Sequence, residues 1–249
     1  MGISLKQAFA FVPQDPKWIT KVFIGGLILF FPSFVFIFPG VKRLLFDPIN
    51  YYLITLFGLI FLTTGLAVSG YFFKTVHNRI IHDKGRLPSW KYFSYYIYVG
   101  LKSYIGGFII SIPFLMILAL LMFFAPMTMS RELIPFIMIA GIVHIIYTAF
   151  YVMLALNFSL DFRISSFLNI KKAYSLIKDN LINYVLLVFD CLLVAVCNLI
   201  LSFILLNGQI LVLLLPFVSF YVCLVYTDLF AQFAITTGEE KYDENKCYV

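Results

Sequence analysis

The sequence predicts an all-α membrane protein, a polytopic bundle of six transmembrane helices with amphipathic surface helices on the cytoplasmic side. Of the 249 residues, 62% are hydrophobic and 12% are charged, whereas soluble domains contain about 45–50% apolar and about 25% charged residues. The apolar residues form runs of about 20, the length that crosses a bilayer. Basic residues, which give the net charge of +6, lie between these runs, as they do at a membrane surface.

Six apolar stretches are long enough to span the membrane. They are residues 19–38, 51–73, 104–126, 134–156, 181–206 and 210–234. The second stretch is expected to continue as one helix to His82, about 48 Å in all, so that its last turns leave the roughly 30 Å hydrocarbon core. Residues 5–12, 90–98 and 161–180 combine apolar or aromatic with basic positions and are expected to form surface helices.

The distribution of Lys and Arg predicts the orientation of the chain. Only Lys42, Arg43 and Arg131 of the 18 basic residues fall on one side of the predicted spans, and the others fall on the opposite side. Because basic loops stay in the cytoplasm, both termini are expected to be cytoplasmic. The predicted location is the inner membrane of a bacterium or archaeon, and residues 237–249 are predicted to be a flexible cytoplasmic tail.

An internal repeat divides the predicted transmembrane domain, residues 1–236. The hexapeptide 21–26 (KVFIGG) recurs about 81 residues later at 102–107 (KSYIGG), and 4–9 (SLKQAF) recurs more weakly at 169–174 (NIKKAY). We therefore expect three parallel pseudo-repeats of a surface helix and two spans, over residues 1–83, 84–164 and 165–236. A chance recurrence of a similar helix entrance in an apolar sequence is the alternative.

Several motifs in the first half of the chain resemble those of a known family. They comprise Trp18 with Lys21, Gly25-Gly26 and Pro32, then Gly70-Tyr71, Gly85-x-Leu87-Pro88-x-Trp90 and Gly100-Leu101. In these the chain resembles a prokaryotic integral membrane family catalogued as domain of unknown function 4013. More distantly it is similar to the membrane-anchor domain beside some glycerophosphodiester phosphodiesterases. The resemblance implies a helical bundle in a prokaryotic membrane and supplies no reaction, cofactor or catalytic residue.

Three ionisable residues stand out within the predicted spans: His144, Asp190 and Asp228. Such residues cost at least about 2.5–3.5 kcal/mol each on insertion and are candidates for function. The two carboxylates lie at a similar level and could form a relay for protons or cations, or bind a cationic group. The alternative is an interhelical polar clasp, with Asp228 paired to Arg163 or Lys178.

A second candidate site is the basic stretch after the second span, where an anionic lipid headgroup or an acidic partner could bind. Its residues are Lys74, His77, Arg79, Arg86 and Trp90. The simpler interpretation is that these charges only set the topology.

No enzyme motif is recognisable in the sequence. We find no Cys/His metal spacing, no Gly-rich phosphate loop and no nucleophile elbow, and the four cysteines do not suggest a disulfide framework. No catalytic residue, cofactor or metal is predicted, and an enzyme acting on lipid is the least supported class.

The leading hypothesis is a non-enzymatic scaffold or subunit of a membrane complex. It would dock a protein partner, a second copy or anionic lipid at its basic cytoplasmic face, and no nucleic acid is expected. The alternative is a small-solute or ion transporter or channel that uses Asp190 and Asp228.

Overall fold

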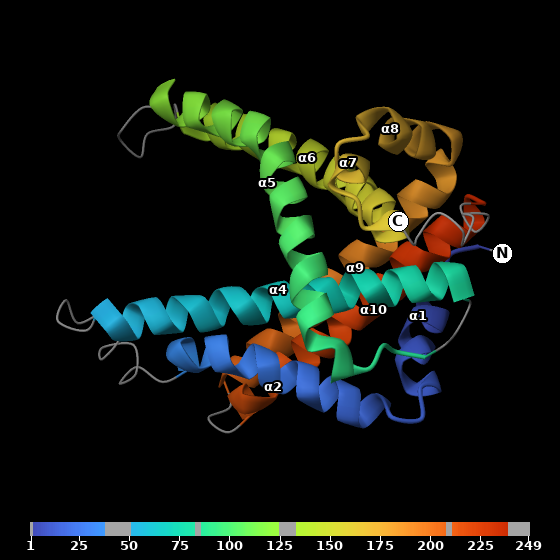
Figure 1. Cartoon of the computed structure of the whole chain (residues 1–249). Helices are drawn as coiled ribbons and strands as arrows, with labels where there is room; N and C mark the ends of the chain where they lie inside the picture. The colour runs from blue at the N-terminus through green and yellow to red at the C-terminus, as the bar shows by residue number, and fades with distance from the viewer. Residues whose placement is uncertain (1, 38–50, 83–85, 125–132, 208–210, 239–249) are drawn as a thin grey trace. The chain divides into compact units, whose positions relative to one another are not determined.

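The computed structural model describes residues 2–37, 51–82, 86–124, 133–207 and 211–238 (Figure 1). Within these ranges every regular element is a helix. The long helices are α2 (Trp18–Ile37), α4 (Tyr51–His82), α5 (Phe93–Phe124), α6 (Leu133–Asp161), α9 (Leu181–Asn207) and α10 (Leu215–Thr236). The short ones are α1 (Leu5–Phe11), η1 (Val12–Gln14), η2 (Trp90–Tyr92), α7 (Ile164–Phe167), α8 (Ile170–Asp179) and η3 (Leu211–Leu214).

Five helices of the described chain, α4, α5, α6, α9 and α10, are long and apolar enough to cross a membrane. The prediction of an all-helical, multi-pass membrane protein is therefore confirmed. The first predicted span coincides with α2, whose described apolar part, Trp18–Phe30, is shorter than a span. The sixth span thus stays a prediction, and the predicted outer loops and the tail from 239 onward lie outside the described residues.

The chain forms two compact units. One comprises residues Met1–Leu101 and Asn180–Val249, and the other comprises Lys102–Asp179. The single transmembrane domain over 1–236 and the three pseudo-repeats stay predictions.

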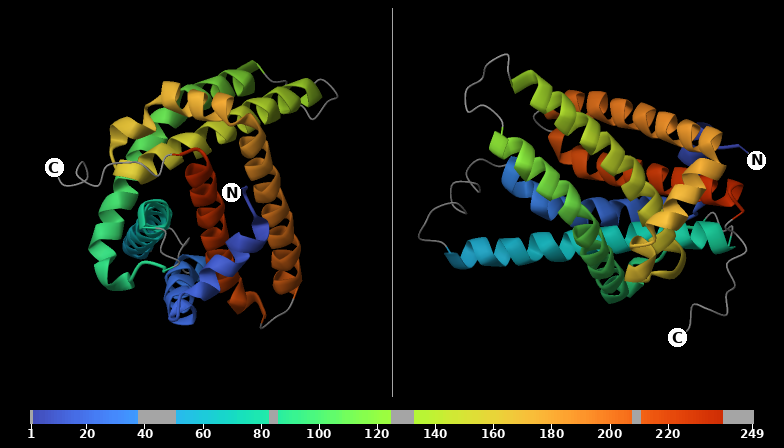
Figure 2. Two further views of the ribbon diagram at one scale, coloured as in Figure 1. Left: turned by 90° about the vertical axis from the view of Figure 1, so that its right-hand side faces the viewer. Right: turned by 90° about the horizontal axis from the view of Figure 1, so that it is seen from above.

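Helix α10 is the centre of the first unit. It packs against α1, α2, α4 and α9, and most residues of its second half are buried. In both views of Figure 2 α9 and α10 run beside each other, and α10 also packs against α2 and α4. Where they meet, Phe220 and Leu224 of α10 and Tyr71 of α4 form the buried core.

The predicted long helix after residue 51 is confirmed, because α4 is continuous from Tyr51 to His82. It crosses the first turns of α5 at two glycines. A Cβ added at Gly70 would overlap the backbone of Tyr96, and one added at Gly100 would overlap the backbone of Leu66. Small residues permit this close approach and fix where the end of α4 lies.

The predicted surface helices differ from the structure in two places. Residues 90–98 do not form a separate helix, because η2 leads directly into the 32-residue α5. Residues 161–180 form two short helices, α7 and α8, which pack on α6 in the second unit. The N-terminal helix exists as α1, but it packs on α10 and buries Ala8 and Phe11 instead of presenting that face to the membrane.

Helices α1 and α8 begin in the same way. The Ser4 hydroxyl oxygen accepts a hydrogen bond from the Gln7 backbone N–H, and the Asn169 side-chain oxygen accepts one from the Lys172 N–H. Each donor residue is followed by a fully buried alanine. Both are N-caps of the kind that Ser and Asn commonly form, and the repeat stays a prediction.

Candidate functional site

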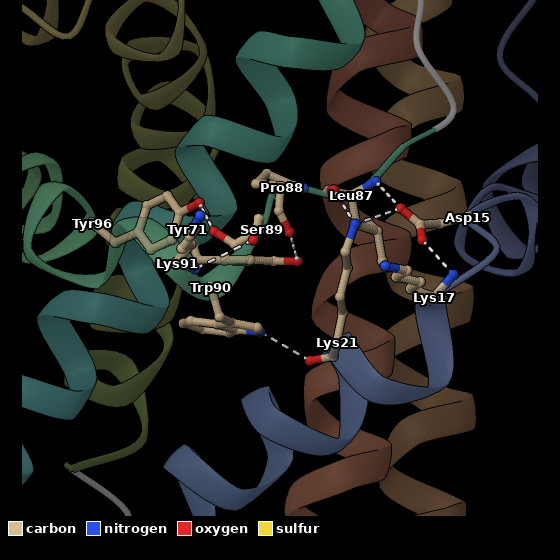
Figure 3. A network of polar contacts seen from close by, with 10 residues as sticks. All are labelled: Asp15, Lys17, Lys21, Tyr71, Leu87, Pro88, Ser89, Trp90, Lys91 and Tyr96. Atoms are coloured by element: carbon tan, nitrogen blue, oxygen red, sulfur yellow. Dashed lines mark hydrogen bonds and ion pairs between the residues drawn. The ribbon is translucent and has the colours of Figure 1, made fainter.

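Two clusters of hydrogen-bonded polar residues lie in the first unit. The first joins the segment before α2 to the segment between α4 and α5 (Figure 3). We call it the loop junction. Its side chains come from Asp15, Lys21, Tyr71, Trp90 and Tyr96, and its backbone groups come from residues 17, 21 and 87–89.

Asp15 is the central carboxylate of the loop junction and is only 1% exposed. Its Oδ1 accepts from the Lys17 N–H at 2.7 Å, and its Oδ2 accepts from Lys21 Nζ at 2.7 Å and from the Leu87 N–H at 2.8 Å. Lys21 Nζ also donates to the Leu87 carbonyl, and the Lys21 carbonyl accepts from Trp90 Nε1 at 3.0 Å. Burial works to raise the pKa of Asp15, but the hydrogen bonds and charge of Lys21, with the backbone donors, outweigh it and lower that pKa.

Aromatic residues close the other side of the junction. The Tyr71 ring stacks on Trp90 at 4.1 Å between centroids and 10° between planes. The Tyr71 hydroxyl donates to the Pro88 carbonyl at 3.0 Å, and the Tyr96 hydroxyl donates to the Ser89 carbonyl at 2.6 Å. The side chains thus bond to the connecting backbone itself.

The chemistry of the loop junction is that of a structural clasp. Its carboxylate, ammonium and both phenol groups are hydrogen-bonded, and buried groups of this kind stabilise a fold when they are fully paired. No role for Asp15 was predicted from the sequence. The available signal was the Gly-x-Leu-Pro-x-Trp turn, which supplies three of the carbonyls, one of the amides and the indole of the junction.

The second cluster, the arginine cluster, links α4, α10 and the N-terminus of α1. Arg79 Nε donates to Asp228 Oδ1 at 2.9 Å, and Gln232 Nε2 donates to Asp228 Oδ2 at 2.6 Å. The Gln232 side-chain oxygen accepts from the Ser4 N–H at 2.7 Å. The Asp228 side chain is fully buried and that of Arg79 is 18% exposed, so both oxygens of a buried carboxylate are satisfied.

The structure gives Asp228 an interhelical partner, as the clasp interpretation required, and that partner is Arg79 of α4. Arg163 and Lys178, the partners suggested by the sequence, belong to the other unit. Arg79 lies beside Asp228 because α4 continues past the core and packs along α10.

The other two intramembrane candidates are not part of either cluster. Asp190 is half-buried on α9 and makes no hydrogen bond or ion pair with any residue that the structure describes. His144 is exposed on α6, in the other unit, with its ring 5.9 Å from that of Phe114.

The predicted basic site is divided among different environments. Trp90 belongs to the loop junction and Arg79 to the arginine cluster. Lys74 lies over the Tyr95 ring at 5.9 Å, His77 is buried, and only Arg86 is exposed. Across the described ranges, no group of three or more His, Cys, Asp or Glu side chains could hold a metal ion.

A comparison with known families tests the resemblance described in the sequence analysis. The family model of DUF4013, described as a protein of unknown function, matches residues 53–207. The chain belongs to the DUF4013 family. No curated protein and no solved structure shows significant similarity to it, and the similarity to the phosphodiesterase anchor domain stays a prediction. The DUF4013 match includes Arg79 of the arginine cluster and Asp190, whereas Asp15 and Asp228 lie outside it.

Proposed function

We propose that this DUF4013 protein is a non-enzymatic subunit or scaffold of a complex in the cytoplasmic membrane of a bacterium or archaeon. The observation that carries the proposal is the environment of Asp190. It is the carboxylate of an apolar, span-length helix, and no described residue of its own chain bonds to it.

The face of α9 that bears Asp190 is open. Leu186 and Leu193, about one helical turn away on either side, are 45% and 39% exposed, and only 11% of the most apolar part of α9 is buried. Lipid tails cannot satisfy a carboxylate, whereas a neighbouring helix can offer a hydroxyl, amide or basic side chain. A partner helix, from a second copy or another protein, would therefore both cover the leucines and pair with Asp190.

The alternative is a transporter or channel in which Asp190 binds an ion. The arrangement of Asp228 favours the scaffold, because its carboxylate is already bonded to Arg79 and Gln232. A relay of the two carboxylates would have to break that ion pair, and leaving a buried charge unpaired costs about 3–5 kcal/mol.

The basic face of the protein is proposed to contact anionic lipid headgroups. Exposed Arg86 is the side chain best placed for this contact, and Lys74 is the second candidate. Arg79 is less suitable because it is already paired within the fold. Loss of an anionic lipid from the purified protein in Arg86→Gln, measured by native mass spectrometry, would support this contact, and unchanged retention would contradict it.

The topology proposed for this complex has six spans, with α2 as the first, and both termini in the cytoplasm. At 20 residues, α2 is about 30 Å long, which matches the hydrocarbon core. A reporter that is active only in the cytoplasm, fused after residue 249, is expected to be active, and activity only of a periplasmic reporter would contradict the orientation.

The mass of the particle in mild detergent tests the assembly. The unaltered protein and Leu199→Ala, a change on another face of α9, are expected to purify as a defined assembly, and Asp190→Leu as a smaller particle. Flux measured in proteoliposomes for the same variants separates the alternatives. Loss of flux in Asp190→Asn with the assembly intact would support the transporter, and a monomeric unaltered protein would overturn the scaffold.

A further inference from the structure

The first unit contains an apolar pocket of about 370 Å³ between α1, α2, α9 and α10. Its walls are hydrocarbon, aromatic and sulfur side chains with one amide, that of Asn198. Trp18 and Tyr221 meet edge to face at 6.3 Å in the wall, and the Tyr221 hydroxyl donates to the Phe9 carbonyl at 3.0 Å. The aromatic wall is therefore tied to α1.

Asn198 is the unexplained polar group of this pocket. Its side-chain oxygen is buried and has no hydrogen-bond partner among the residues that the structure describes. A buried acceptor left without a donor is unfavourable, and the other wall residues are too apolar to hold the water cluster that would otherwise fill the space. The pocket thus has room for an apolar group and lacks one hydrogen-bond donor.

The chemistry of the occupant follows from these two features. A volume of this size is at the small end of those that bind organic ligands. Two of the four helices that line the pocket, α9 and α10, are long and apolar enough to span a membrane, so bilayer lipids are the ligands available to it. A cation could donate to Asn198 but would lose its hydration among apolar walls. A neutral hydroxyl group can donate the hydrogen bond without the cost of desolvating a charge.

We propose that the pocket binds one hydrocarbon chain of a membrane lipid that carries a free hydroxyl, which donates a hydrogen bond to the Asn198 side-chain oxygen. A monoacylglycerol and the glycerol headgroup of phosphatidylglycerol share this chemistry. The site is independent of Asp190 and of the proposed assembly.

Trp18 provides a direct probe, because bromine atoms on a lipid chain quench tryptophan fluorescence at contact. Protein in phosphatidylcholine nanodiscs is titrated with a chain-brominated monoacylglycerol. Saturable quenching is expected in the unaltered protein and not in Trp18→Phe, which retains Trp90. Unbrominated monoacylglycerol should reverse the quenching roughly five- to tenfold more effectively than the methyl ester of the same acid, as expected for one net hydrogen bond.

Two variants separate the pocket from the surrounding lipid. In Asn198→Leu the preference for the hydroxyl lipid over the ester should fall to about one. In Cys197→Phe, which fills the pocket from its wall, saturable quenching should be lost, whereas Leu199→Phe on another face of α9 should retain it. Competition by phosphatidylglycerol or by monoacylglycerol then identifies the source of the hydroxyl. Equal competition by alcohol and ester in the unaltered protein, or quenching unaffected by Cys197→Phe, would overturn the proposal.

Discussion

Asp190 and Asp228 lie in neighbouring apolar helices, yet the fold treats them in opposite ways. Asp228 is fully buried and bonded to Arg79 and Gln232, whereas Asp190 is half-buried and has no partner in the described chain. Both are equally conspicuous in the sequence. A carboxylate within an apolar helix therefore indicates an interaction site only when the chain itself leaves that carboxylate unpaired.

The largest effect on stability is expected when Asp228 loses its cationic partner and is left unpaired, as Asp190 is. Arg79→Leu leaves a buried carboxylate without its cation and should lower the free energy of unfolding by about 3–5 kcal/mol. Denaturation of the detergent-solubilised protein measures this loss. The double variant Arg79→Leu/Asp228→Leu should recover most of it, and exposed Arg86→Leu should change stability by less than about 0.5 kcal/mol. A single variant as stable as the unaltered protein would show that the ion pair does not hold α4 to α10.

The next effect concerns a third carboxylate, Asp15, which is paired like Asp228 but lies outside the spans. Asp15→Asn replaces an oxygen that accepts from Lys21 and Leu87 with a donor. The expected destabilisation is about 1.5–3 kcal/mol at neutral pH, as for hydrogen bonds to charged groups.

The pH dependence of that variant has a definite sign. The pKa of Asp15 is lowered from 3.8 in the folded state, so its stabilisation is complete above the unfolded-state pKa and disappears as the pH falls through the folded-state pKa. The stability difference between the unaltered protein and Asp15→Asn should therefore be constant near pH 7 and shrink below about pH 4. A difference that grows on acidification would contradict the assigned hydrogen bonds.

The third test concerns the close crossing of α4 and α5 at Gly70 and Gly100. Gly70→Ala introduces a Cβ that overlaps the Tyr96 backbone and should cost about 1–3 kcal/mol through displacement of the helices. Gly58→Ala is the matched control on the same helix, because a Cβ there meets no atom within 4 Å. It should be neutral or stabilising by up to about 1 kcal/mol. Thermal unfolding that ranks the two variants in the reverse order would refute the crossing.

The smallest effect on stability is expected at Asp190 itself. In detergent, under conditions that keep the chain monomeric, Asp190→Leu should change the free energy of unfolding by less than about 0.5 kcal/mol, because no described residue bonds to it. Asp228→Leu, measured in parallel, should be strongly destabilising, because it strands the Arg79 guanidinium. Similar losses in both variants would remove the distinction between the two carboxylates.

The sequence was sufficient to predict the long helices because lipid forces each apolar run to satisfy its own backbone. The length of α4 followed from the same rule. The pairing of side chains did not, because Arg79 and Asp228 are 149 positions apart and meet only after α4 and α10 pack. Asp15 lies between two prolines in a connecting segment, and nothing in that local pattern indicates the Leu87 amide as its donor.

Photo-crosslinking in intact membranes tests the central claim, that another protein helix covers the Asp190 face of α9. A photo-reactive phenylalanine analogue is placed at position 193, about one turn from Asp190, and at position 60, on an exposed part of α4, as the control. The account predicts a discrete protein adduct from position 193 that disappears when Asp190→Leu is added. Lipid adducts alone from position 193, with no protein adduct in the unaltered background, would contradict it.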